Sequence, residues 1–117
     1  MGRRPVPPAQ RLPRLQPRQR EMLLLTIAAG HASNFVPARF YSAWTVRIGG
    51  DGRPSVIVTF ADSVGQRLLS LRLIELHPDP TLAEVHGPSG IIGRRYVPTA
   101  AGIARIGAQS PASEQRS

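Results

Sequence analysis

Two stretches decide the expected fold. Residues 68–76 read LLSLRLIEL, and residues 93–106 read GRRYVPTAAGIARI. The first continues a pattern in which Val64, Leu68 and Leu71 recur at helical spacing, so we expect a helix over residues 62–76. Glu75 falls on the apolar stripe of that helix, which indicates that its regular part ends near Leu73. The second stretch predicts a strand that runs directly into a short helix.

The polar face of the 62–76 helix is the main candidate binding surface. Asp62 or Ser63 can cap its first turn. Opposite the apolar stripe lie polar side chains, and an arginine flanks the stripe: Ser63, Gln66, Arg67, Ser70 and Arg72. Such a face is either a recognition surface or simply a solvated one.

Two β-hairpins are predicted, one before and one after this helix. Residues 45–60 alternate around the turn sequence GGDG, and residues 82–86 and 91–97 flank the turn sequence GPSG. Arg94 and Arg95 are neighbours on the last strand, so only one of them can face a given partner. Thr99 is expected to cap a closing helix over residues 100–106.

The N-terminal part of the domain is predicted to be helical. Residues 18–29 have helical periodicity and stop at Gly30. Asn34 could cap a second short helix with Pro37 in its first turn, giving an apolar stripe of Phe35, Ala38, Tyr41 and Trp44. Tyr41 and Trp44 are expected in the core rather than stacked on a base, because the chain has few aromatic residues.

The back half of the chain resembles a winged helix-turn-helix domain. The residues that carry the resemblance, within about 62–106, are Arg67, Leu68, Leu71, Leu73, Ile74, Glu75, Arg95, Tyr96, Thr99 and Gly102. The resemblance implies an α+β fold, namely a small winged-helix domain with three to four helices and a wing at residues 82–97. It also implies that the 62–76 helix enters the major groove of DNA. Two features depart from the family: Pro98 stands where leucine is common, and the 45–60 hairpin stands where a second helix usually leads into the recognition helix.

The charge is concentrated at the N-terminus. The net charge is +8, and residues 1–20 contain six arginines and no acidic residue. The five prolines of residues 1–17 favour an extended basic arm, in which Arg11 and Arg14 could follow a DNA backbone. An arm without a role is the alternative. All fifteen basic residues are arginine, which fits a GC-rich bacterial or phage genome.

The composition excludes several classes of protein. Cysteine is absent and the three histidines are not spaced as metal ligands, so no metal or cofactor is expected. No nucleophile or carboxylate pair stands in a catalytic context, so we do not expect an enzyme. The longest apolar run, residues 22–29, is too short for a membrane span, so we expect a cytoplasmic, nucleoid-associated protein. The expected organisation is an arm at 1–17, a domain at 18–106 and a disordered polar tail at 107–117.

These features together predict a sequence-specific DNA-binding protein, a small transcriptional regulator or repressor. Its partner would be double-stranded DNA. Homodimerisation is left open. Two alternatives also remain: a protein-interaction module on a winged-helix scaffold, and an architectural protein that binds nucleic acid without sequence preference.

Overall fold

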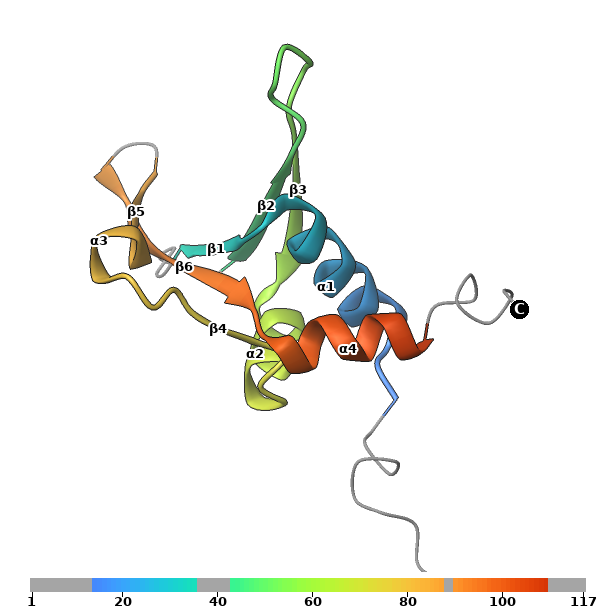
Figure 1. Cartoon of the computed structure of the whole chain (residues 1–117). Coiled ribbons are helices and arrows are strands. Elements are labelled where there is room, and N and C mark those ends of the chain that lie inside the picture. Colours follow the sequence, from blue (N-terminus) through green and yellow to red (C-terminus); the bar gives the residue numbers. More distant parts are fainter. Residues whose placement is uncertain (1–13, 36–42, 88–89, 110–117) are drawn as a thin grey trace, which may run out of the picture.

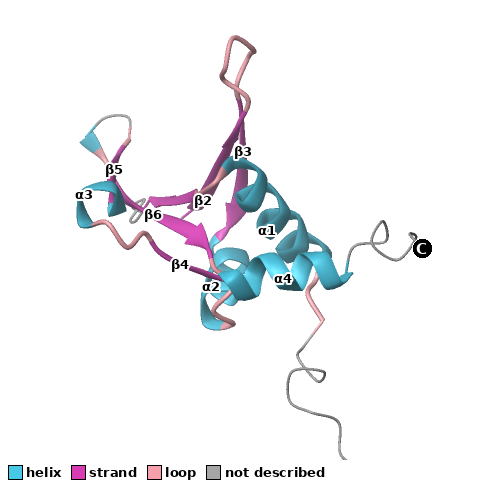
Figure 2. Cartoon of the chain, viewed as in Figure 1, coloured by secondary structure: helices cyan, strands magenta, loops and turns pink. Residues whose placement is uncertain are grey.

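The computed structural model describes residues 14–35, 43–87 and 90–109 as one α+β domain (Figures 1 and 2), which confirms the predicted fold class. Within these residues the chain forms four helices and one six-stranded antiparallel sheet. In chain order the elements are α1 (Pro17–Ala29), β1 (Ala32–Phe35), β2 (Ala43–Ile48), β3 (Val56–Ala61), α2 (Asp62–Ser70), β4 (Ile74–Leu76), α3 (Pro80–Ala83), β5 (Glu84–His86), β6 (Ile92–Pro98) and α4 (Ala100–Gln109).

Strand β6 pairs with three other strands of the sheet, β1, β4 and β5. The strand order is β3-β2-β1-β6-β4, and β5 also pairs with β6. Tyr96 is the register partner of both Ala32 in β1 and Leu76 in β4, while Arg94 is the partner of both Asn34 in β1 and Glu84 in β5. Strands β4 and β5 therefore follow one another along the same edge of β6.

One face of the sheet forms the core. Trp44, Val46 and Phe60 are almost fully buried on this face, and helices α1 and α2 pack over it. The Trp44 and Tyr96 rings lie 4.9 Å apart between centroids. Side chains alternate between the faces of a strand, so their neighbours Thr45, Arg47 and Arg95 point to the opposite face, where they are half-buried or exposed.

Helix α1 confirms the prediction for residues 18–29. It ends at Gly30, whose φ of 94° is the left-handed conformation that favours glycine at a helix C-terminus. At its start, the Gln16 backbone N–H donates to Gln19 Oε1 at 2.9 Å, and Leu15 is 6% exposed within the core. The packed domain thus begins by Leu15, earlier than the expected start at residue 18.

The prediction of a helix over residues 62–76 is wrong in its second half. Helix α2 ends at Ser70, and residues 74–76 form strand β4. Two backbone bonds of 3.0 Å, Arg72 N–H to Leu69 O and Leu73 N–H to Leu68 O, close a Schellman motif. The end of the helix at this point buries Leu73 and Ile74 and lets β4 pair with β6. The stabilisation from this burial and pairing outweighs the local preference of residues 71–76 for a helix.

The prediction of a helix within residues 31–44 is also wrong over its described part. Residues 32–35 form β1 between β2 and β6, and Trp44 belongs to β2. Asn34 does not cap a helix; its buried side chain donates to Ala43 O at 3.2 Å. Trp44 is in the core as expected, whereas Pro37, Ala38 and Tyr41 lie outside the described residues.

Both predicted hairpins are present, with adjusted bounds. Strands β2 and β3 pair along their whole length, and β5 pairs with β6. Leu82 and Ala83 belong to α3 instead of β5; Asp79 caps α3 by accepting from Thr81 Oγ1 and Thr81 N–H, which lowers the pKa of its carboxyl group. Thr99 caps α4 as predicted, because Thr99 Oγ1 accepts from Gly102 N–H at 3.0 Å. Helix α4 continues to Gln109, so the prediction of a disordered tail over residues 107–117 is wrong for residues 107–109. Residues 1–13 of the predicted arm and residues 110–117 of the predicted tail lie outside the described residues.

Candidate nucleic-acid interface

Helix α2 is fixed to the sheet through its inner face. Gly65 and Leu68 are buried, and Gly65 lies so close to the Trp44 indole that a Cβ atom would overlap the ring. At the first turn, Asp62 Oδ1 accepts from Trp44 Nε1 and from Gln66 Nε2, each at 3.3 Å. This attachment turns Ser63, Gln66, Arg67 and Ser70 outward, and all four are exposed as the helical pattern predicted.

Arg72 continues this surface beyond the helix. It occupies the left-handed region with a φ of 61°, and it is the one described residue other than glycine with a positive φ. Its carbonyl oxygen accepts from Thr99 Oγ1 at 2.8 Å, so the backbone is held while the side chain remains exposed. The C-terminal end of α2 therefore presents two arginines, Arg67 and Arg72.

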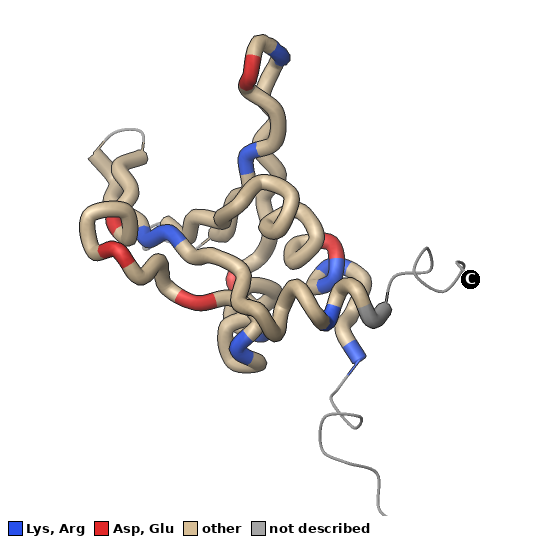
Figure 3. Tube along the Cα trace, viewed as in Figure 1, with Lys and Arg blue, Asp and Glu red and all other residues tan. Residues whose placement is uncertain are grey.

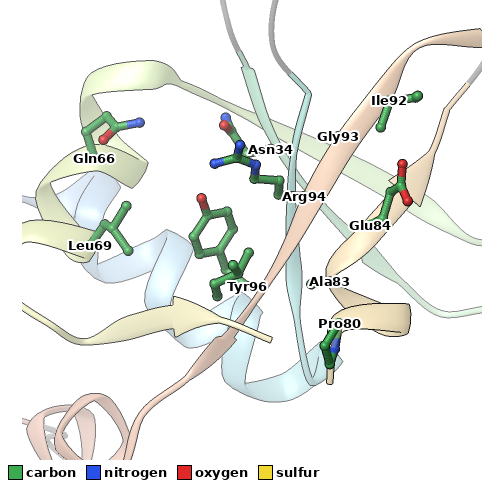
Figure 4. A pocket seen from close by; sticks show the side chains of 11 residues that line it. Asn34, Gln66, Leu69, Pro80, Ala83, Glu84, Ile92, Gly93, Arg94 and Tyr96 are labelled. Atoms are coloured by element: carbon green, nitrogen blue, oxygen red, sulfur yellow. The ribbon is translucent and has the colours of Figure 1, made fainter. Parts of the chain in front are cut away.

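The β5–β6 hairpin separates its two arginines. Arg94 and Gln66 line a common cleft of about 720 Å³ between α2 and the sheet, together with Asn34 and Tyr96 (Figure 4). The Arg94 side chain makes no hydrogen bond or ion pair within the described part of the chain, although its register partner Glu84 is acidic. Its guanidinium is therefore available to a ligand beside α2.

Arg95 lies on the opposite face of the sheet from Arg94. Its Nη1 donates to Leu82 O at 3.0 Å, and it lines a second hollow that contains no α2 residue. Only one of the two arginines thus shares a surface with Gln66, as strand alternation requires. Of the arm residues, Arg14 is exposed just before α1, and Arg11 lies outside the described residues.

The charges are distributed unevenly. Figure 3 shows basic positions at the start of α1 and at the end of α2, and acidic positions along the segment from β4 through α3 to β5. The acidic positions are Glu75, Asp79 and Glu84. Arg18 is already engaged by Glu21 at 2.8 Å and by Thr59 O at 2.9 Å. Three other arginines near α1 and α2 are exposed to solvent: Arg14, Arg67 and Arg72.

Asn34 and Tyr96 are among the cleft residues that sequence reasoning missed. The Tyr96 hydroxyl points into the cleft beside Arg94 in Figure 4, which follows from their spacing of two residues on one strand. No sequence pattern placed Asn34 there, because its position depends on pairing between β1 and β6, sixty residues apart in register.

No family model matches the chain, and neither the curated proteins nor the solved structures contain a match to it. Within the described residues, no group of three or more histidine or acidic side chains could hold a metal ion. None of the helices in that part of the chain is both long enough and apolar enough to cross a membrane.

Proposed function

We propose that this protein binds double-stranded DNA with sequence preference and acts as a small transcriptional regulator or repressor. One observation carries the proposal: α2 is anchored by Trp44 and presents a polar face whose one acidic side chain, Asp62, is half-buried and accepts from Trp44 and Gln66. A helix fits the major groove, where arginine pairs with guanine and glutamine with adenine. Arg67 and Gln66 are the residues that would contact base edges.

The neighbouring elements would support α2 on the duplex. Arg94 extends the same surface through the cleft, so the β5–β6 hairpin can act as a wing against the phosphate backbone. Ser63, Ser70 and Arg72 lie beside the two base-reading residues and can donate to phosphates. The arrangement differs from a helix-turn-helix in that α2 follows strand β3 directly.

The test is selection of bound duplexes from a random pool, followed by affinity measurements on a selected and a scrambled duplex at one salt concentration. Arg67→Ala and Gln66→Ala should each remove about 1–3 kcal/mol of discrimination, or roughly 5- to 150-fold, and act mainly on the selected duplex. Arg53→Ala is the matched control, because it removes the same charge from the exposed turn between β2 and β3. Equal losses on both duplexes would contradict base reading by α2.

A protein-interaction module is the second candidate function. It is favoured by the outer strand β3, where Val56 and Ile57 are 57% and 54% exposed. An edge strand of this kind can pair with a strand of another protein or of a second copy of this chain, which would form the homodimer. Failure to enrich any duplex in the selection would favour this candidate.

A further inference from the structure

The sheet face opposite α2 contains a second hollow, of about 630 Å³, between the β2–β3 and β5–β6 hairpins. Two arginines and two histidines line it, and none of its lining residues is acidic: the four are His31, Arg47, His86 and Arg95. We refer to it as the sheet hollow. Its size is within the usual range for small-molecule sites, and its charge favours an anion.

Arg95 is incompletely bonded at the edge of the sheet hollow. Nη1 donates to Leu82 O, but Nε is buried without a hydrogen-bond partner, and no acidic side chain within the described residues forms an ion pair with this guanidinium. A buried donor without a partner is costly, and a charged donor more so. A bound anion would offset the unbalanced charge of this group.

His31 reports the electrostatic potential in the sheet hollow. Burial lowers the pKa of its imidazole, and the positive charge of Arg95 and the nearby His77 lower it further. Burial disfavours a charge of either sign, whereas the positive charges of Arg95 and His77 disfavour a cation and favour an anion at the same place. A bound phosphate would therefore raise the pKa of His31.

Phe35 forms an aromatic wall of the sheet hollow. It lies against two glycines, because a Cβ atom at Gly93 would come within 2.6 Å of Phe35 Cδ1 and one at Gly87 within 2.7 Å of Cε1. Gly93 is also its register partner across β1 and β6. Phe35 and Arg95 are two register positions apart on the same face of the sheet, and both line the sheet hollow.

We propose that the sheet hollow binds a small phosphate-bearing ligand with a planar body, of the nucleotide class. The phosphate would bind between Arg95 and Arg47, and the planar body would lie against Phe35. Arginine pairs with phosphate through two parallel hydrogen bonds, and aromatic rings stack on bases. The site is on the opposite side of the sheet from α2 and shares no lining residue with the cleft beside α2, although the β5–β6 hairpin borders both.

The test uses the full chain without DNA and measures binding of adenosine monophosphate, inorganic phosphate and adenosine by titration calorimetry. Adenosine monophosphate should bind more tightly than either of the others. Arg95→Gln and Arg47→Gln should each weaken it at least about tenfold, since hydrogen bonds to charged groups are strong. Phe35→Leu should reduce the preference for adenosine monophosphate over inorganic phosphate, and Arg53→Gln, outside the hollow, should change neither affinity.

A second readout does not depend on the variants. In the wild-type protein, the His31 pKa followed by NMR should rise when adenosine monophosphate is added. No binding at millimolar ligand, equal affinity for all three probes, or an unchanged His31 pKa at saturation would overturn the proposal. Displacement of the nucleotide by a short duplex would also overturn it, because the hollow would then be a DNA contact. Failure of duplex binding alone would leave this site intact.

Discussion

At the scale of single residues, Gly65 and Trp44 determine where α2 lies. Glycine in a helix interior costs about 1 kcal/mol relative to alanine, so its presence in α2 needs a structural reason. The reason is the absence of a side chain, which lets the helix backbone lie directly on the buried indole. That Trp44 belongs in the core was predictable from the low aromatic content. The sequence did not predict that Trp44 contacts Gly65, because the two residues are distant in sequence.

Gly65→Ala should therefore lower the free energy of unfolding despite its better helix propensity. The added methyl overlaps Trp44, and overpacking of a core costs about 1–3 kcal/mol, which exceeds the gain in propensity. Gly107→Ala in α4 is the control, since no atom lies within 4 Å of its added Cβ, and it should be neutral or stabilising. Urea denaturation measures both. A Gly65→Ala protein as stable as the wild type would show that α2 does not pack on Trp44 in this way.

At the scale of elements, the sequence predicted α1, α4 and both hairpins but misassigned β1 and β4. The predictable elements have periodicity, turn residues or caps within their own segment, such as Gly30 and Thr99. Strand β4 has only three residues, and Ile74 and Glu75 continue the helical spacing of α2. It forms a strand because it pairs with β6, in which the nearest register partner, Tyr96 opposite Leu76, is twenty residues away in sequence. Local patterns carry no information about such pairing.

The end of α2 offers a test of this assignment, because Arg72 adopts a conformation that favours glycine. Arg72→Gly should raise the free energy of unfolding by about 1 kcal/mol through relief of the left-handed strain. Arg67→Gly, inside the helix, should lower it by about 1 kcal/mol. Thermal and urea unfolding should show changes of opposite sign in the free energy of unfolding for the two variants. If both variants were destabilised alike, the helix would continue through residue 72, as the sequence alone predicts.

At the scale of the whole molecule, the candidate interface consists of residues that the fold brings together. The exposure of Gln66 and Arg67 followed from the helical pattern, and the separation of Arg94 from Arg95 followed from strand alternation. The sequence did not predict that α2, β6 and Asn34 line one cleft, because this arrangement depends on the order of strands in the sheet. The sheet hollow has the same origin, since it joins residues of β1, β2, β5 and β6.

The distribution of charge leads to the last prediction, on the N-terminal arm. Leu15 is buried and Gln16 caps α1, so a deletion should end at residue 13 to spare the packed domain. It removes Arg3, Arg4 and Arg11 and leaves a net charge of +5. Each phosphate contact contributes about 0.9 to the slope of log affinity against log salt, so the slope should fall by up to about 3 units. The ranking of preferred duplexes should stay the same, because phosphate contacts carry no sequence information.

Deletion of residues 110–117 is the matched control for the arm. That segment contains Glu114 and Arg116, so its removal leaves the net charge unchanged, and the salt slope should not change. If deletion of the arm left the slope unaltered, the arm would make no contact with DNA, and binding would depend on α2 and its neighbours alone. If the arm deletion instead abolished binding to selected and scrambled duplexes equally, the architectural alternative would be favoured. In that outcome the energy of binding would lie in the arm, and the face of α2 would be a solvated surface.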